Sequence, residues 1–408
     1  MPARRTLLLA SVALAPAAAF AQTPKKPPAR PAAAAPRPRK PAEAVATGSP
    51  AQTPLGPVDT AAKFAVILDH TTGATLLDKD ADASMVPSSM TKLMTAYIVY
   101  GMLKAGRLKL DQELPVSEKA WRMQGSKMFV GIGSQVKVED LIRGMIVQSG
   151  NDACIVLAEA IAGSEEQFAE LMNAKAKELG LQQSNFRNST GWPDPQHRMS
   201  ARDIAVVARR LITEFPEYYK YDSEKSFKYN NIDQQNRNTL VQKNLADGLK
   251  TGHTEEGGYG LVASAERRGR RVIVVLNGMT SMHQRGEEGE KLLEWAFREW
   301  ENVNLFTAAD TVEKIPVDLG TAPTVPLVTG RDVVLTLPRN WRTTLKVSLS
   351  YEAPVRAPVQ RGSQLGSLAV HGAGVPDTEI PLLAGADVPR LGLPGRAMAV
   401  LSRYMGGR

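Results

Sequence analysis

The 408-residue chain has only one cysteine, Cys154, so no disulfide can form within it. Cys154 lies in an apolar run close to Asn151, where we expect a buried and inert thiol. The histidines are scattered and form no His-Glu-x-x-His or paired-ligand pattern, so we expect no metal and no other cofactor. They are His70, His197, His253, His283 and His371. A Gly-x-Ser-x-Gly sequence is also missing, which argues against an ordinary hydrolase triad.

The N-terminus decides which partners the basic composition allows. Lys and Arg number 50 against 42 acidic residues, a formal net charge of +8 that suits nucleic acid, anionic lipid or an anionic wall polymer. Residues 1–21 combine Arg4 and Arg5 with an apolar stretch ending in Ala19-Phe20-Ala21, typical of a secretory signal peptide and too short for a membrane span. The paired arginines leave the twin-arginine export route open beside the general one. Export to the periplasm makes nucleic acid an unexpected partner.

Residues 22–58 are rich in Pro, Ala, Lys and Arg and contain few large apolar residues. Such a segment cannot bury enough surface to offset its ordering entropy. We therefore expect a disordered tether, either a plain spacer or a basic segment that touches anionic wall or lipid.

Three short polar motifs follow in the folded part of the chain. Ser89 and Lys92 form Ser-x-x-Lys, in which the lysine lies one helical turn from the hydroxyl, among apolar neighbours that would lower its pKa. Alone, this pair fits a helix-capping serine and a solvated lysine much better than a catalytic pair. Ser149-Gly150-Asn151 and Lys250-Thr251-Gly252 come later in the order expected for penicillin-recognising serine enzymes. The joint occurrence of all three motifs favours a serine acyl-transfer site.

With these motifs the chain resembles the low-molecular-weight penicillin-binding proteins, and within them the serine-type D-alanyl-D-alanine carboxypeptidases of the peptidase S11-like family. Asn236-Arg237-Asn238 and the stretch 258–264 support the resemblance, which extends from about residue 63 to residue 302 and more loosely to the C-terminus. It implies cleavage of the terminal D-alanine from peptidoglycan stem pentapeptides, and inhibition by β-lactam antibiotics.

The resemblance also implies a role for each catalytic residue. Ser89 would be the nucleophile and Lys92 its base, close to both Ser149 and Asn151. Ser149 would pass a proton to the departing D-alanine, and Asn151 would orient Lys92 and donate to a substrate carbonyl.

The implied substrate-binding residues are Lys250, Thr251, Gly252, His253 and Arg285. Lys250 would help to hold Ser149 and, with Thr251, attract the substrate carboxylate. The backbone N–H groups of Ser89 and His253 would form the oxyanion hole. Arg285 matches an arginine near the family's carboxylate pocket, although a solvated surface arginine fits the sequence nearly as well.

Hydrophobic periodicity predicts an α+β catalytic domain over residues 59–302. Strand patterns occur at 64–69, 74–77, 259–264 and 272–278, and helix patterns at 88–105, 138–147, 152–162, 165–179, 200–213 and 286–301. Terminal strands with helices inserted between them predict one shared antiparallel sheet. The resemblance implies the same architecture, the penicillin-binding and β-lactamase-like transpeptidase fold, with Lys250 on the strand that borders the cleft.

Two further parts follow the catalytic domain. Residues 303–388 show short strand patterns separated by Pro and Gly, which predicts a small β-rich domain for spacing or partner binding. Residues 389–408 place Met398, Leu401 and Met405 on one helical face flanked by arginines, which resembles the family's amphipathic anchor at the outer face of the cytoplasmic membrane. A frayed tail remains the alternative.

Three other functions remain open. A D,D-endopeptidase that cuts cross-links would use the same chemistry. A class A β-lactamase uses a dedicated glutamate for deacylation, but Glu165, Glu166 and Glu170 fit solvated charges on an amphipathic helix. The third alternative is a catalytically idle scaffold that binds the cell wall, which the intact motifs disfavour.

Overall fold

The computed structural model describes residues 49–372 and 375–406. The expected signal peptide and residues 22–48 of the expected tether lie outside the described residues. The expectation that residues 49–58 belong to a disordered tether is wrong. Ala51 is fully buried and forms a β-bridge with Val58, and Gln52 forms one with Asp78. The folded domain therefore begins earlier than the composition suggested.

A five-stranded antiparallel sheet organises the catalytic domain, with strand order β2-β1-β9-β8-β7. Its strands are β1 (Phe64–Asp69), β2 (Thr75–Lys79), β7 (Gly248–Thr254), β8 (Gly258–Arg267) and β9 (Arg270–Met279). Strands from both ends of the domain share this sheet, which confirms the expected α+β architecture. β7 is one of its two edge strands and carries the Lys-Thr-Gly motif.

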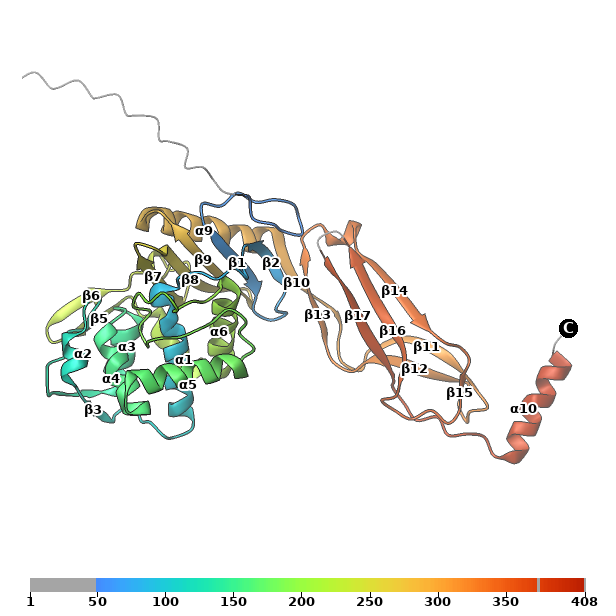
Figure 1. The fold of residues 1–408 in the computed structure, drawn as a ribbon. Helices are drawn as coiled ribbons and strands as arrows, with labels where there is room; N and C mark the ends of the chain where they lie inside the picture. Colours follow the sequence, from blue (N-terminus) through green and yellow to red (C-terminus); the bar gives the residue numbers. More distant parts are fainter. Residues whose placement is uncertain (1–48, 373–374, 407–408) are drawn as a thin grey trace, which may run out of the picture. The chain divides into compact units, whose positions relative to one another are not determined.

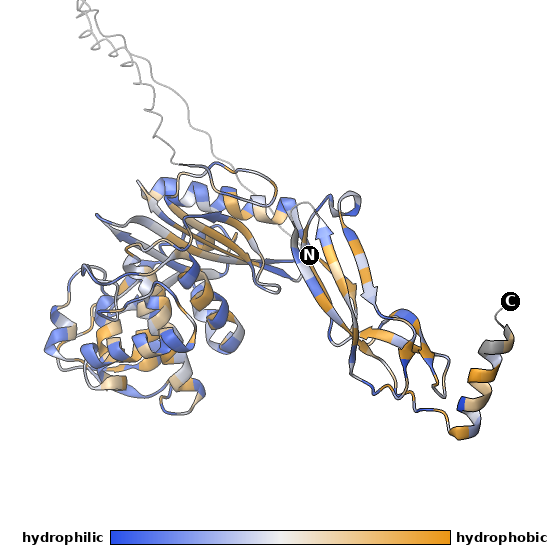
Figure 2. Ribbon diagram, turned by 45° about the vertical axis from the view of Figure 1, so that its right-hand side comes forward, coloured by the Kyte–Doolittle hydropathy of each residue, from blue (hydrophilic) through white to orange (hydrophobic). Residues whose placement is uncertain are grey.

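Alternation along the strands gives the sheet two apolar faces. Val66, Ile273 and Val275 belong to the core shared with the larger group of helices, whereas Ile67 and Val274 face α9 (Met282–Glu299) and α8 (Thr239–Gln242). This period of two is expected for a strand whose successive side chains point to opposite faces. Figure 1 shows α9 lying across one side of the sheet and α1, α3, α4, α5 and α6 on the opposite side, and Figure 2 shows apolar residues along the strands between them.

Between β2 and β7 lie, besides α8, η1 (Ser88–Thr91), α1 (Lys92–Lys104), α2 (Glu118–Arg122), α3 (Val138–Ile146), α4 (Asn151–Ala162), α5 (Glu165–Glu178), α6 (Ala201–Glu214), α7 (Pro216–Tyr219) and η2 (Lys220–Ser223). The longer helices α1, α3, α4, α5 and α6 lie close to their predicted ranges, whereas α2, α7, α8 and η2 were not predicted. Two small antiparallel pairs accompany them, β3 (Glu113–Pro115) with β4 (Gln135–Lys137) and β5 (Ser226–Tyr229) with β6 (Ile232–Gln235). α1 is buried along nearly its whole length, which fixes the position of its first residue, Lys92.

The β-rich part contains a six-stranded sheet of order β14-β16-β17-β12-β11-β15 and a separate β10–β13 pair. The strands are β10 (Trp300–Phe306), β11 (Thr311–Asp318), β12 (Thr324–Thr329), β13 (Val333–Pro338), β14 (Lys346–Tyr351), β15 (Val355–Arg356), β16 (Gln364–Gly372) and β17 (Val375–Ala384), with the short η3 (Trp341–Thr343) after β13. Its core is independent of the catalytic cores and includes Ile315, Leu327 and Leu382. Strand patterns at residues 312–317, 333–337, 344–350 and 367–370 predict β11, β13, β14 and β16; the other strands were not predicted.

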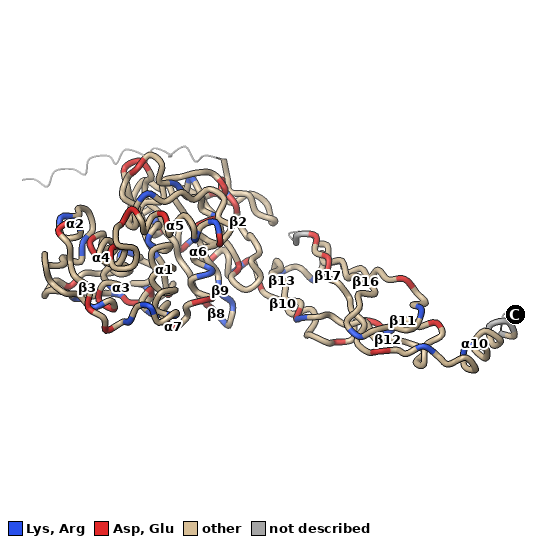
Figure 3. Tube along the Cα trace, turned by 60° about the horizontal axis from the view of Figure 1, so that its bottom comes forward, with Lys and Arg blue, Asp and Glu red and all other residues tan. Residues whose placement is uncertain are grey.

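The C-terminal helix α10 (Leu393–Gly406) exposes several large apolar side chains. Leu393, Met398 and Met405 are 76%, 69% and 74% exposed. Figure 3 shows charges of both signs interspersed over the catalytic domain and few on α10. Within residues 49–372 and 375–406, no helix combines the length and apolarity needed to cross a bilayer.

Candidate active site

Ser89 and Lys92 meet at the junction between η1 and α1. In a 3₁₀ turn the side chains of residues i and i+3 eclipse each other, which places the lysine beside the hydroxyl. Lys92 Nζ lies 2.9 Å from Ser89 Oγ, 2.7 Å from Asn151 Oδ1 and 2.7 Å from the carbonyl oxygen of Thr190. The side chain is completely buried, and this burial lowers its pKa to about 8.

These three partners suit a lysine that acts as a base. A neutral amine has two N–H groups and one lone pair. The oxygens of Asn151 and Thr190 accept hydrogen bonds only, so they take the two N–H groups of neutral Lys92. The lone pair is then directed at the Ser89 hydroxyl, as removal of its proton requires.

The Ser-x-Asn motif is brought to the same place by the start of α4. Asn151, the first residue of the helix, donates from Nδ2 to the carbonyl oxygen of Gln124 at 2.8 Å while it accepts from Lys92. Ser149 has a positive φ of 61°. Its Oγ is buried and has no hydrogen-bond partner among the described residues, so the hydrogen bond by which Lys250 was expected to hold it is not formed.

The Lys-Thr-Gly motif approaches Ser89 along β7. Lys250 is 2% exposed, and its Nζ donates to the carbonyl oxygen of Thr251 at 3.0 Å. Burial and then the charge of Lys92 lower the pKa of Lys250. Gly252 is needed for the close approach, because a Cβ there would lie 3.1 Å from both the carbonyl oxygen of Pro87 and the Cβ of Ser88. His253, the next residue, packs its ring on Tyr259 with centroids 3.9 Å apart.

Arg285 is buried, not solvated. It is 3% exposed, donates from Nη2 to the carbonyl oxygen of Arg237 at 3.0 Å and lies over the Tyr259 ring. Burial and then the charge of Arg237 lower the pKa of Arg285 to about 10. Arg237 was missed as a site residue; its Nη1 donates to Ser126 Oγ at 2.5 Å. Arg237, Arg285 and Lys250 form a group of cations, and the charges of the two arginines lower the pKa of Lys250.

A cavity of about 410 Å³ opens above the nucleophile and is lined by Ser89, Asn151, Trp192, His253 and Glu255, among others. Sequence reasoning missed the contribution of residues 188–194, which form an irregular loop without a recognisable motif.

The side chain of Asn188 holds this loop in shape. Its Oδ1 accepts from the backbone N–H groups of Thr190, Gly191 and Trp192 at 3.2, 2.8 and 3.0 Å. Gly191 has a positive φ of 80°, and a Cβ there would lie 1.8 Å from the carbonyl oxygen of Ser88. The loop is therefore fixed against the nucleophile turn.

Glu165 was expected to be a solvated charge on an amphipathic helix, and this expectation is wrong. It is 8% exposed, unlike the exposed Glu166 and Glu170, so it is not a solvated charge. Its Oε1 accepts from Ser189, and its Oε2 pairs with Lys119 at 3.2 Å. Glu165 does not line the cavity above Ser89, so it does not supply the deacylating base that the β-lactamase alternative needs.

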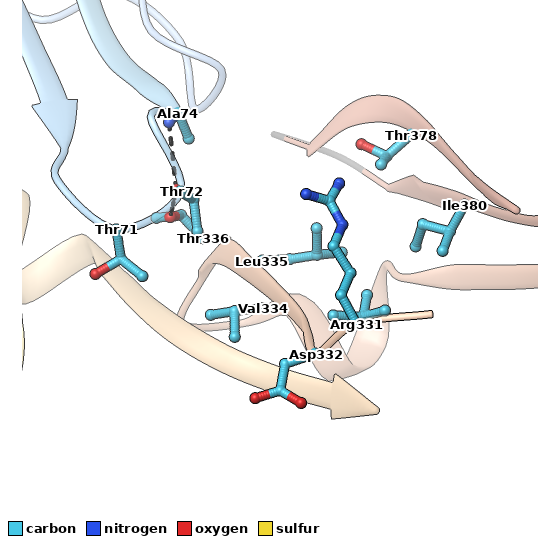
Figure 4. A pocket seen from close by; sticks show the side chains of 11 residues that line it. Thr71, Thr72, Ala74, Arg331, Asp332, Val334, Leu335, Thr336, Thr378 and Ile380 are labelled. Atoms are coloured by element: carbon cyan, nitrogen blue, oxygen red, sulfur yellow. Dashed lines mark hydrogen bonds between the residues drawn. The ribbon is translucent and has the colours of Figure 1, made fainter. Parts of the chain in front are cut away.

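A second cavity, of about 440 Å³, lies between the β1–β2 turn and residues of β13 and β17 (Figure 4). Thr72 and Thr336 meet there with their hydroxyl oxygens 2.5 Å apart, and the Arg331 side chain extends among the lining residues. None of the residues that line this cavity is a lysine, histidine or cysteine. Its one carboxylate, Asp332, accepts a hydrogen bond from the Ala308 N–H, and the Thr72 and Thr336 hydroxyls pair with each other. The pairing of a hydroxyl with a buried amine that suits acyl transfer is found at Ser89 and Lys92.

The fold and this site have the parts of a serine acyl-transfer enzyme, a serine hydroxyl beside a buried lysine amine. Comparison with known proteins identifies the family. The family model described as D-alanyl-D-alanine carboxypeptidase matches residues 49–280, and the model of the penicillin-binding protein 5 C-terminal domain matches residues 300–390. The chain belongs to the D-alanyl-D-alanine carboxypeptidase family and is a serine-type enzyme of that activity.

Individual relatives match this chain over most of their own length. The chain is 39% identical to D-alanyl-D-alanine carboxypeptidase DacC of Escherichia coli, over 81% of this chain and 85% of the relative. It is 36% identical to DacA of the same organism, over 79% and 83%. Among solved structures, penicillin binding protein 5 from Haemophilus influenzae superposes with a TM-score of 0.74 at 35% identity, covering 82% of this chain and 99% of that one. Both the catalytic fold and the β-rich domain are thus shared.

Proposed function

We propose that the enzyme removes the terminal D-alanine from peptidoglycan stem pentapeptides through an acyl-enzyme on Ser89. The observation that carries this proposal is the buried Lys92 amine, 2.9 Å from Ser89 Oγ and held by two further oxygens. As Ser89 Oγ bonds to the carbonyl carbon between the two D-alanines, its proton passes to Lys92. The C–N bond then breaks, and the departing amine receives a proton.

Ser149 is suited to relay that proton: its hydroxyl gives a proton to the leaving nitrogen and takes one from Lys92, which becomes neutral again. Its hydroxyl is buried beside Asn151 and has no hydrogen-bond partner in the described structure, so it is available to the leaving nitrogen. Water then attacks the ester, and Lys92 acts again as the base, because no other base lies within hydrogen-bond reach of Ser89 Oγ in the described residues. The second product is the shortened stem peptide.

Substrate recognition rests on the cations at the β7 side of the cleft. A terminal carboxylate bound near Lys250, Thr251, Arg237 and Arg285 would offset the cost of burying these charges and favour protonated Lys250. Ser89 and His253 line one cavity, which supports their backbone N–H groups as the oxyanion hole. Gly252 allows β7 to come this close to the nucleophile turn.

The same site would bind β-lactam antibiotics as inhibitors. A penicillin presents a strained amide carbonyl and a carboxylate in the relative places that the peptide occupies. Ser89 would open the ring, and slow deacylation would leave a lasting adduct.

We also propose that the enzyme works in the periplasm, peripherally attached to the outer face of the cytoplasmic membrane. The N-terminal sequence supports export. The exposed apolar side chains of α10 support attachment in the plane of the membrane interface.

Release of D-alanine from a pentapeptide, compared with cleavage of a cross-linked dimer, tests the proposed reaction. We expect the pentapeptide to be the better substrate, and Lys92→Ala to lose activity while its circular dichroism stays unchanged. Preference for the dimer would indicate an endopeptidase. Rapid turnover of penicillin without D-alanine release would indicate a β-lactamase, and inactivity towards all three would indicate a scaffold.

A further inference from the structure

The position of the catalytic lysine depends on a backbone carbonyl outside the three motifs. Thr190 contributes its carbonyl oxygen, 2.7 Å from Lys92 Nζ, as one of the two acceptors that direct the amine towards Ser89. Thr190 lies in the loop of residues 188–194, which has no helix or strand hydrogen bonds to fix it. Whatever holds this loop therefore also sets the direction of the Lys92 lone pair.

Ser189, the residue before Thr190, is anchored on both sides. Its backbone N–H and its hydroxyl both donate to Oε1 of Glu165, at 3.1 and 2.8 Å. Its carbonyl oxygen accepts from Thr95 Oγ1 at 2.6 Å, one turn along α1 from Lys92. Ser189 is fully buried, so water cannot replace the acceptor that Glu165 supplies.

Glu165 is placed for this task by the start of α5. Ser164 caps the helix by accepting from the Gln167 N–H, so Glu165 occupies the first helical position. Its other oxygen forms an ion pair with Lys119, whose side chain is 44% exposed. Lys119 also pairs with Glu166, which is 73% exposed and makes no contact with Ser189 among the described hydrogen bonds. Such an exposed pair contributes little by itself.

We propose that Glu165 is a positioning residue for acyl transfer: by accepting two hydrogen bonds from Ser189 it fixes the Thr190 carbonyl that orients Lys92. The proposal rests on the Ser89–Lys92 chemistry set out above. It assigns Glu165 no contact with substrate. The essential property is the acceptor oxygen Oε1, and the negative charge is secondary.

Two substitutions at position 165 separate the acceptor from the charge. Glu165→Gln keeps an oxygen for Ser189 and removes the charge, whereas Glu165→Ala removes both. Glu166→Ala is the matched control, because it breaks the neighbouring pair with Lys119 and leaves Ser189 untouched. A fluorescent penicillin, followed by stopped flow over a range of concentrations, gives the acylation rate constant and the dissociation constant of the preceding non-covalent complex separately.

We expect Glu165→Ala to lower the acylation rate constant at least tenfold and to change the dissociation constant less than twofold. Glu165→Gln should stay within threefold of the wild type, and Glu166→Ala should match it. A purely structural role would lower the melting temperature and leave the rate constant of the folded protein unchanged, which would overturn the proposal. Equal losses in Glu165→Gln and Glu165→Ala would also overturn it, because the charge would then matter more than the acceptor.

A second variant covers the case in which Glu165→Ala does not fold. Ser189→Ala removes one of the two donors to Glu165 and should lower the acylation rate constant three- to tenfold; an unchanged rate constant contradicts the proposal. Lys92→Ala, measured alongside, tests the underlying chemistry separately. Normal acylation in that variant would refute the proposed function itself, whatever the result at Glu165.

Discussion

Acylation should accelerate with rising pH because the burial of Lys92 brings its pKa to about 8. The base is the neutral amine, so activity needs the deprotonated form. At pH 7 the neutral fraction is roughly 9%, against roughly 0.03% for a solvated lysine of pKa about 10.5, a gain of about 300-fold from burial. Between pH 7 and pH 9 the fraction rises roughly tenfold, and it changes little above that range.

The assay is the acylation rate constant for a fluorescent penicillin at saturating concentration, measured from pH 6 to pH 9.5. Saturation separates the titration of Lys92 from that of the groups that bind the carboxylate, and circular dichroism at each pH confirms that the protein stays folded. Lys243→Ala is a suitable control, because this exposed lysine should leave the profile unchanged. A flat profile, or a rise that continues to pH 9.5 without levelling off, would refute the view that burial prepares Lys92 as the base.

Three other predictions follow from the site and from α10. Gly191→Ala should lower the free energy of unfolding by more than about 2 kcal/mol and also lower acylation, because the new Cβ would collide with the Ser88 carbonyl oxygen. Thermal melts measure the loss of stability, and penicillin labelling measures the loss of acylation. Arg285→Met should raise KM for a pentapeptide roughly 10- to 100-fold and leave KM for its C-terminally amidated analogue unchanged, whereas equal effects on the two peptides would rule out carboxylate binding. Met398→Asp combined with Leu401→Asp should abolish sedimentation with anionic vesicles and preserve D-alanine release; retained sedimentation would exclude α10 as the anchor.

The strands of the sheet could be predicted from the sequence, and the three motifs could be recognised in it, because both depend on local patterns. Alternating apolar residues in β1, β8 and β9 give a strand period that is visible without any tertiary information. The Ser89–Lys92 spacing likewise fixes a local geometry, one helical turn. The family resemblance then supplied the remaining partners, Ser149-Gly150-Asn151 and Lys250-Thr251-Gly252, whose proximity depends on long-range packing.

The features that were missed depend on partners distant in the sequence. Glu165 has the pattern of a solvated charge on an amphipathic helix, and only its contact with Ser189, 24 residues later, shows that it is buried. Arg237 lies in a stretch that supported the resemblance, yet its place beside Arg285 is set by tertiary packing. Ala51 lies in a stretch whose composition is typical of a tether, and only the packing of the folded chain shows that it belongs to the core.

The central claim is that the three motifs form one acyl-transfer site with Ser89 as its nucleophile. Incubation with a labelled penicillin, followed by peptide mass mapping over time, tests this claim most directly. We predict one stoichiometric, slowly decaying adduct on Ser89 and none in Ser89→Ala. An adduct on another residue, or labelling that persists in Ser89→Ala, would contradict the account.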